Sequence, residues 1–238
     1  MSNIAVIMAG GRGSRLGSLT DECPKPMLRV GGRPILETIL LNLREFDIDH
    51  VYLAVNYRAE MIEDFFGDGS AHDLRIDYLR ERERLGTAGA LGMLPARPDK
   101  RFIVMNGDVL TKVNVTDLLA FHGRVGAIAT MCVRQHDFQV PFGVVAVEGH
   151  SVLRIDEKPV RRDFVNAGLY VLDPIALDSI APRTYLDMTT LLNSLIAAGH
   201  RAAAFPVSEY WLDVGRHADF ERANGEFPNE FAHRVVSS

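Results

Sequence analysis

The chain has 238 residues, of which 47% are hydrophobic and 24% charged, with a net charge of -5. These values predict one globular domain that buries a sizeable core. They exclude a general affinity for nucleic acid, which depends on many Lys and Arg contacts to phosphates, and no apolar run is long enough to span a membrane. Two cysteines form neither a metal cluster nor a disulfide framework, so we expect a cytoplasmic protein.

Strand and helix patterns alternate through the first half of the chain. Apolar strand patterns at 4–9 and 50–55 flank a helical pattern at 34–46. Further along we expect a helix at 59–66, a strand at 74–79, a short helix after Gly86 and a strand at 102–105. This alternation predicts an α/β fold with a Rossmann-like, mixed but mostly parallel sheet and helices on both faces.

The second half begins with a β-rich portion. Strand patterns occur at 127–133, 143–147, 152–155 and 165–172, with a turn at 148–151. Helices at 174–180 and 188–198, a strand at 202–207 and a final helix from 217 complete the prediction. No repeat or long linker interrupts the sequence, so we expect one compact unit.

The loop "GGRGSRLGSLTDECPKP", residues 10–26, follows the first predicted strand. Ligands of open α/β sheets bind at the carboxyl ends of strands, and glycines there let backbone N–H groups approach an anion. Arg12, Arg15 and Lys25 add positive charge, and the prolines on both sides of Lys25 predict an extended backbone there. The loop is therefore predicted to bind phosphate.

Two common phosphate-binding motifs do not fit this loop. A dinucleotide fingerprint requires glycine or alanine where Leu16 stands, and no acidic residue ends the second strand. A Walker A loop requires lysine after its last glycine, where Ser18 stands. A different class of phosphate-binding site remains.

The segment "AGGRGSRLGSLTDECPKPMLRVGGRPILE" resembles the motif of the sugar-1-phosphate nucleotidyltransferases, or NDP-sugar pyrophosphorylases. The segments "LGTAGAL", "NGD", "EKP", "NAGLYV" and "WLDVG" follow in the order of that family, over about nine tenths of the chain. The resemblance is greatest to small bacterial guanylyltransferases of the mannose-, heptose- or glucosamine-1-phosphate type. It implies the nucleotide-diphospho-sugar transferase fold, with a nucleotide half at about 1–112, a sugar-phosphate half at about 113–225 and a tail at about 226–238.

The resemblance also implies the roles of site residues. Arg15 and Lys25 would be catalytic, and Mg²⁺ would bind Asp108, which ends a strand, and Asp213. The implied nucleotide contacts are Ala9, Gly10, Gly11, Gly13, Glu81, Gly86, Thr87 and Ala88. The implied sugar-phosphate contacts are Gly143, Glu157, Lys158, Asn166, Gly168 and Trp211, although a lone tryptophan equally suits a core.

Glu81 stands where thymidylyl and some uridylyl members of the family carry glutamine. A carboxylate can accept from the paired N–H donors of guanine, whereas an amide suits a pyrimidine imide. This favours GTP, but a solvated Glu81 on a charged turn is an equal alternative.

The sequence thus predicts an Mg²⁺-dependent enzyme that joins a nucleotide, favoured as GMP from GTP, to a sugar 1-phosphate for surface-glycan synthesis. Its partners would be the two substrates, without nucleic acid or membrane, and a homo-oligomer is left open. A uridylyltransferase that makes a UDP-sugar and a catalytically silent nucleotide-sugar-binding subunit remain as alternatives.

Overall fold

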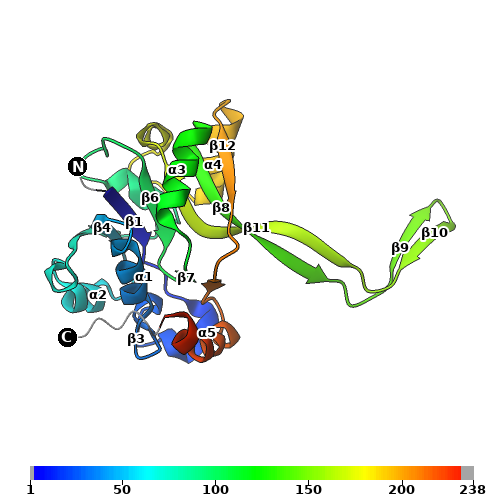
Figure 1. Cartoon of the computed structure of the whole chain (residues 1–238), viewed down its shortest axis with the longest axis horizontal. Coiled ribbons are helices and arrows are strands. Elements are labelled where there is room, and N and C mark those ends of the chain that lie inside the picture. Colours follow the sequence, from blue (N-terminus) through cyan, green and yellow to red (C-terminus); the bar gives the residue numbers. More distant parts are fainter. Residues whose placement is uncertain (1–2, 232–238) are drawn as a thin grey trace.

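A seven-stranded sheet organises the computed structural model, which describes residues 3–231 (Figure 1). In spatial order its strands are β12 (Ala202–Pro206), β8 (Ala129–Gln139), β11 (Val160–Leu172), β6 (Phe102–Asn106), β1 (Asn3–Met8), β4 (Ile48–Val55) and β5 (Arg75–Arg80). β11 runs antiparallel to both of its neighbours, and the other pairs are parallel. The predicted mixed, mostly parallel sheet is confirmed.

Short ribbons and helices surround this sheet. The described two-stranded ribbons are β2 (Arg29–Val30) with β3 (Arg33–Pro34), β7 (Val109–Thr111) with β13 (Trp211–Asp213), and β9 (Val144–Glu148) with β10 (Ser151–Asp156). The α-helices are α1 (Ile35–Arg44), α2 (Ala59–Phe66), α3 (Val115–Val125), α4 (Met188–Ala197) and α5 (His217–Glu230). The 3₁₀ helices are η1 (Ser14–Thr20), η2 (Lys25–Met27), η3 (Ser70–His72), η4 (Gly89–Met93) and η5 (Pro174–Ser179).

The sheet separates two apolar layers. Side chains alternate along β1, so that Ala5 and Ile7 belong to one buried cluster and Val6 to the other. Helices α1, α2, α3 and α5 cover the first face, and α4, η4 and η5 cover the second. Helices therefore cover both faces, as predicted. Within residues 3–231, no helix combines the length and apolar character needed to cross a membrane.

Most predicted elements form close to their expected positions, but no helix is predicted from sequence where α3 forms. The Asn114 side chain caps its start by accepting from the Asp117 N–H at 3.1 Å, and Gly126 ends it at φ +60°. Its inner face includes His122, buried and 2.8 Å from the Thr130 hydroxyl. A buried polar residue on the inner face weakens the apolar pattern that predicts helices.

The β-rich portion differs most from expectation. β8 and β11 extend six and five residues beyond the predicted strands and carry β9 and β10 far from the rest of the molecule (Figure 1). We call residues 134–166 the arm and the remaining described residues the body. The expectation of one compact unit did not include this projection, because exposed strands lack the alternation that burial produces.

The end of the chain also differs in part. The predicted tail begins at about residue 226, yet α5 continues to Glu230 and Phe231 is buried against the first apolar layer. Residues 232–238 of that tail lie outside the described residues.

Candidate functional site

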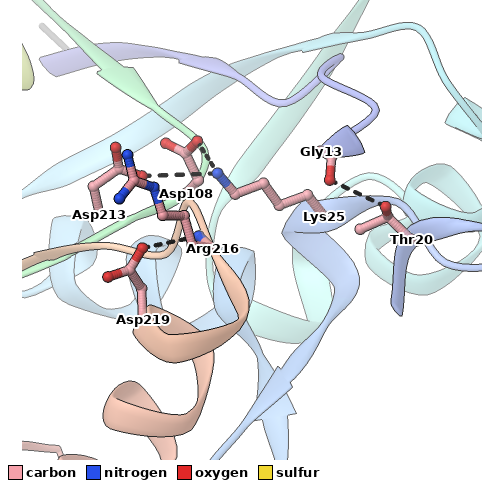
Figure 2. A network of polar contacts seen from close by, with 7 residues as sticks. All are labelled: Gly13, Thr20, Lys25, Asp108, Asp213, Arg216 and Asp219. Carbon is pink, nitrogen blue, oxygen red and sulfur yellow. Dashed lines mark hydrogen bonds and ion pairs between the residues drawn. The ribbon is translucent and has the colours of Figure 1, made fainter. Parts of the chain in front are cut away.

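The glycine-rich loop leaves β1 at the carboxyl edge of the parallel strands and folds onto Lys25. Gly13 has a φ of +71°, and a Cβ there would lie 2.9 Å from Cβ of Lys25, so the loop needs glycine at this position. The Thr20 hydroxyl donates to the Gly13 carbonyl at 3.1 Å (Figure 2). The loop is thus closed against the lysine that follows it.

Lys25 is 5% exposed and points into a pair of carboxylates (Figure 2). Its Nζ lies 2.5 Å from Asp108 Oδ2 and 3.7 Å from Asp213 Oδ1. The predicted extended backbone between the two prolines is wrong, because Lys25–Met27 form a 3₁₀ turn that starts after an extended Pro24. Pro26 suits the first turn of such a helix, where its missing N–H is not needed.

The ribbon of β7 and β13 brings the two aspartates together from distant parts of the sequence. Asp213 pairs with Val109, and the Val214 N–H donates to the Asp108 carbonyl at 3.0 Å. Asp108 Oδ1 and Asp213 Oδ1 are buried without a hydrogen-bond partner. Burial and the neighbouring Asp108 raise the pKa of Asp213, although Lys25 and Arg15 oppose the shift. Two half-buried carboxylates, each with a buried Oδ1 atom that has no hydrogen-bond partner, fit a hard divalent cation.

A cleft of about 350 Å³ opens over this cluster and contains most of the predicted nucleotide and metal residues. Those that line it are Gly10, Gly11, Gly13, Arg15, Lys25, Glu81, Gly86, Thr87, Asp108 and Asp213. Ala9 and Ala88 are buried behind it, where their N–H groups donate to the carbonyls of Ala54 and Leu186. These two alanines therefore lie outside the lining of the cleft, and their contacts to the nucleotide stay predictions.

Glu81 and the turn that follows it form the far wall of the cleft. Glu81 Oε2 accepts from the Leu85 N–H at 3.1 Å, and burial raises the pKa of this carboxyl. Gly86 has a φ of +76°, and a Cβ there would meet the Leu186 carbonyl at 2.5 Å. Glu81 thus lies at the cleft wall, and its contact to guanine stays a prediction.

Several residues that line this cleft were not predicted as contacts. They are Met8, Ser14, Arg84, Asn106, Tyr185 and Asp187, and the lining also includes Arg12, which is predicted as a cation of the phosphate-binding loop. Asp187 accepts from the Thr87 N–H at 3.3 Å and from the Tyr185 hydroxyl at 2.9 Å. About a hundred residues separate the two sides of this contact, so only the folded chain reveals it.

A second cleft of about 640 Å³ adjoins the first and shares Arg15 and Asp213 with it. Asn166 and Trp211 line it, and the Trp211 indole donates to the Ala167 carbonyl at 2.8 Å. The Asn166 amide donates to the Tyr170 hydroxyl at 2.6 Å. Two of the six predicted sugar-phosphate residues thus lie beside the carboxylate cluster.

The other four predicted sugar-phosphate residues do not line this cleft. Gly168 is buried at φ +69°, and a Cβ there would lie 2.8 Å from the Asn106 amide nitrogen. Gly143, Glu157 and Lys158 lie on the arm, where a Cβ on Gly143 would meet Glu157 Oε2 at 3.1 Å. The structure brings these three together with one another, but not with the clefts of the same chain (Figure 1).

A comparison with models of known protein families shows to which family the chain with these two clefts belongs. The model of the family described as nucleotidyl transferase matches residues 4–230. The chain belongs to this family. Its predicted nucleotide-diphospho-sugar transferase fold is confirmed by similarity to solved structures. HddC from Yersinia pseudotuberculosis is 25% identical with a TM-score of 0.73, covering 94% of this chain and 99% of that one. A putative glucose-1-phosphate thymidylyltransferase from Bacillus anthracis is 23% identical with a TM-score of 0.76, covering 100% and 97%.

Curated relatives of this nucleotidyl transferase are longer proteins. The mannose-1-phosphate guanyltransferase of Schizosaccharomyces pombe is 33% identical over 91% of this chain and 62% of its own length. The mannose-1-phosphate guanylyltransferase of Mycobacterium tuberculosis is 32% identical over 93% and 64%. The bifunctional protein GlmU of Methanococcus maripaludis is 30% identical over 97% and 56%. The chain spans less than two thirds of each of these relatives.

A larger hollow of this nucleotidyl transferase, about 1030 Å³, lies at the opposite edge of the sheet. Its lining includes Asn3, Lys100, Ile128 and His200, which stand at or just before the amino ends of β1, β6, β8 and β12. It contains neither the glycine-rich loop nor the paired carboxylates. Since ligands of such sheets bind at the carboxyl edge, we place the functional site at the two adjoining clefts.

Proposed function

We propose that the chain transfers the GMP group of GTP to a hexose 1-phosphate and so forms a GDP-sugar and pyrophosphate. The observation that carries this proposal is the cluster of Lys25, Asp108 and Asp213 at the point where the two clefts meet. A reaction between two anionic substrates requires two adjoining binding regions with charge neutralisation between them.

In this proposal the triphosphate lies along the glycine-rich loop. A phosphate oxygen of the hexose 1-phosphate attacks the α-phosphorus of GTP, a new P–O bond forms, and the bond to the β-phosphate oxygen breaks. Arg15 and Lys25 would neutralise the departing pyrophosphate. The attacking phosphate is already an anion, so the reaction requires no general base from the protein.

Asp108 and Asp213 would hold Mg²⁺ through their unpartnered oxygens. When bound, the ion would supply positive charge at the phosphate oxygens. Lys25 now occupies the space between the two carboxylates, so it would turn toward the triphosphate when the site is loaded. This lysine would therefore compensate the charge of the two carboxylates before the substrates bind and the charge of the phosphates afterwards.

The preference for GTP and for a hexose is supported by two observations. Glu81 lines the nucleotide cleft and one of its oxygens is engaged by Leu85, while a carboxylate has further acceptor sites for the N–H donors of guanine. The mannose-1-phosphate guanylyltransferases that resemble this chain make mannose 1-phosphate the first sugar to test. A cytoplasmic location and a role in polysaccharide synthesis remain predictions attached to this proposal.

The test is a pyrophosphate-release assay with Mg²⁺, four nucleoside triphosphates and a panel of sugar 1-phosphates. We expect the highest kcat/KM with GTP and mannose 1-phosphate. Higher turnover with UTP than with GTP would contradict the proposal and identify the chain as the alternative, a uridylyltransferase. Background release with every pair, combined with saturable GTP binding in calorimetry, would replace the proposal by the silent binding subunit.

A further inference from the structure

The arm carries most of the large apolar side chains that the described residues expose. Of thirteen such side chains, nine lie between Phe138 and Phe164, within a segment that projects from the body (Figure 1). Apolar surface concentrated in one region marks a site of association. The arm therefore has an unpartnered apolar surface, whereas the body has covered nearly all of its own.

The tip of the arm, made of β9 and β10, is apolar on one face. The cross-strand pairs Val145 with Ile155 and Val147 with Val152 fall on that face, and these four side chains are 46% to 65% exposed. The alternate pair of Ala146 with Arg154 presents the other face. An isolated two-stranded ribbon is marginally stable in water, so its apolar face requires a covering surface.

The stem of the arm holds this tip away from the clefts of its own chain. β8 and β11 pair without interruption from Val133–Asn166 to Gln139–Val160. At about 3.3 Å per residue, the strand from Asn166 to Val160 spans about 20 Å, several times the reach of a lysine side chain. At the base, the Arg134 guanidinium donates to the carbonyls of Val207 and Glu209 at 3.0 and 2.7 Å. Glu157 and Lys158 therefore lie beyond the cleft that contains Asn166.

The second cleft lacks residues that the arm carries. The second cleft, beside Asp213, is lined by Trp211 of the body and by residues at the base of the arm such as Asn166, but not by Glu157 or Lys158 of the same arm. Glu157 and Lys158 are thus missing from the cleft of each copy, and the arm of each copy holds them away from it. Two copies related by a two-fold axis can satisfy both arms and both clefts in one closed assembly.

We propose that two copies of this chain exchange arms, so that Glu157 and Lys158 of one copy complete the sugar-phosphate cleft of the other. The apolar face of each tip is covered by the partner copy, and each dimer contains two composite sites. The inference about the site rests on the function proposed above, whereas the dimer itself can be tested without any substrate.

The decisive experiment is complementation between two inactive variants, Asp213→Asn in the body and Glu157→Ala/Lys158→Ala in the arm. Each carries a different affinity tag, and the mixed dimer is isolated on both tags after co-expression. In a mixed dimer with exchanged arms, one site receives both defects and the other receives none. We expect about half of the wild-type activity from the mixed dimer, and near-background activity from each parent dimer.

Light scattering provides the second measurement. We expect a mass of about twice the 26.4 kDa of the chain for the wild type. The tip variant Val147→Asp/Val152→Asp should give the monomer mass, with an unchanged far-UV circular dichroism spectrum because the body stays folded. The matched control Arg154→Ala, on the other face of the tip, should remain dimeric.

The outcomes separate this inference from the proposed function. A mixed dimer as inactive as its parents shows that each arm serves its own body and overturns the exchange. A fully active arm variant, or a wild type that stays monomeric at assay concentration, overturns it as well. A dimeric wild type that is inactive with every substrate pair overturns the proposed function alone, and loss of the dimer in the tip variant would then still support the apolar contact.

Discussion

The cluster around Lys25 and the arm place charged residues in opposite surroundings. Lys25 is 5% exposed and its ammonium group pairs with two half-buried carboxylates, whereas Lys158 is exposed at the junction of β10 and β11. The main sheet, the glycine-rich loop and the ribbon of β7 and β13 together hold the Lys25 cluster, whereas a single pair of strands, β8 and β11, carries Lys158. A buried charge needs a preformed partner in its own chain, but an exposed charge is free to receive one from outside. The body thus holds a preformed cluster of charges, whereas the arm carries exposed charges that the proposed exchange would bring to a second copy.

The largest expected effect contrasts the stability of the two regions. Leu36→Ala, at a fully buried position in α1, should lower the free energy of unfolding by about 2–5 kcal/mol, because it leaves a cavity. Leu153→Ala, at a position 62% exposed on the arm, should change it by less than about 0.5 kcal/mol. Urea unfolding followed through Trp211 measures both. Equal losses would contradict the division into a self-sufficient body and an arm without a core.

The next effect is on catalysis in the body. Asp213→Asn should lower kcat by about 100-fold to 1000-fold or more, because it removes one charge from the proposed metal site. The side chain keeps its shape, so the melting temperature should change little. Asp178→Asn, in an exposed ion pair with Arg97, is the matched control and should retain activity. Near-normal turnover of the Asp213 variant at saturating Mg²⁺ would remove this residue from the metal site.

A smaller and more selective effect is expected from the arm. Lys158→Ala should raise KM for the sugar 1-phosphate by about 10-fold to 100-fold, with little change in KM for GTP, because one charged contact to phosphate is lost. Arg154→Ala, elsewhere on the arm and paired with Asp156, should leave both values unchanged. Steady-state kinetics with each substrate varied in turn provides the measurement. A matching rise in KM for GTP would instead place Lys158 on the triphosphate.

The smallest effect concerns the choice of base at the wall of the cleft. Glu81→Gln should lower the ratio of kcat/KM for GTP to that for UTP by about 10-fold, since an amide accepts less well from two N–H donors. Glu83→Gln, on the exposed turn two residues further on, is the control and should leave this ratio unchanged. If the ratio of kcat/KM for GTP to that for UTP is unchanged in the Glu81 variant, Glu81 has only a structural role, which is to accept from the Leu85 N–H.

The sequence by itself determined the alternation of strands and helices, the phosphate-type loop and the family, because these depend on local periodicity and ordered motifs. It located α1, α2 and β4 within two residues of their observed bounds. It also named both carboxylates of the cluster. Local pattern did not predict α3, whose inner face carries a buried histidine, or the 3₁₀ turn at Lys25.

Only the tertiary structure decided which of the named residues meet. The pairing of β7 with β13 brings Asp108 to Asp213, and the contact of Thr87 with Asp187 joins residues about a hundred positions apart. The pairing of β8 with β11 forms the arm and so carries Lys158 away from the sugar-phosphate cleft of the same chain. The order of motifs along the chain indicates which groups a reaction uses. The distances between these groups depend on strand pairing between remote segments, which no local pattern encodes.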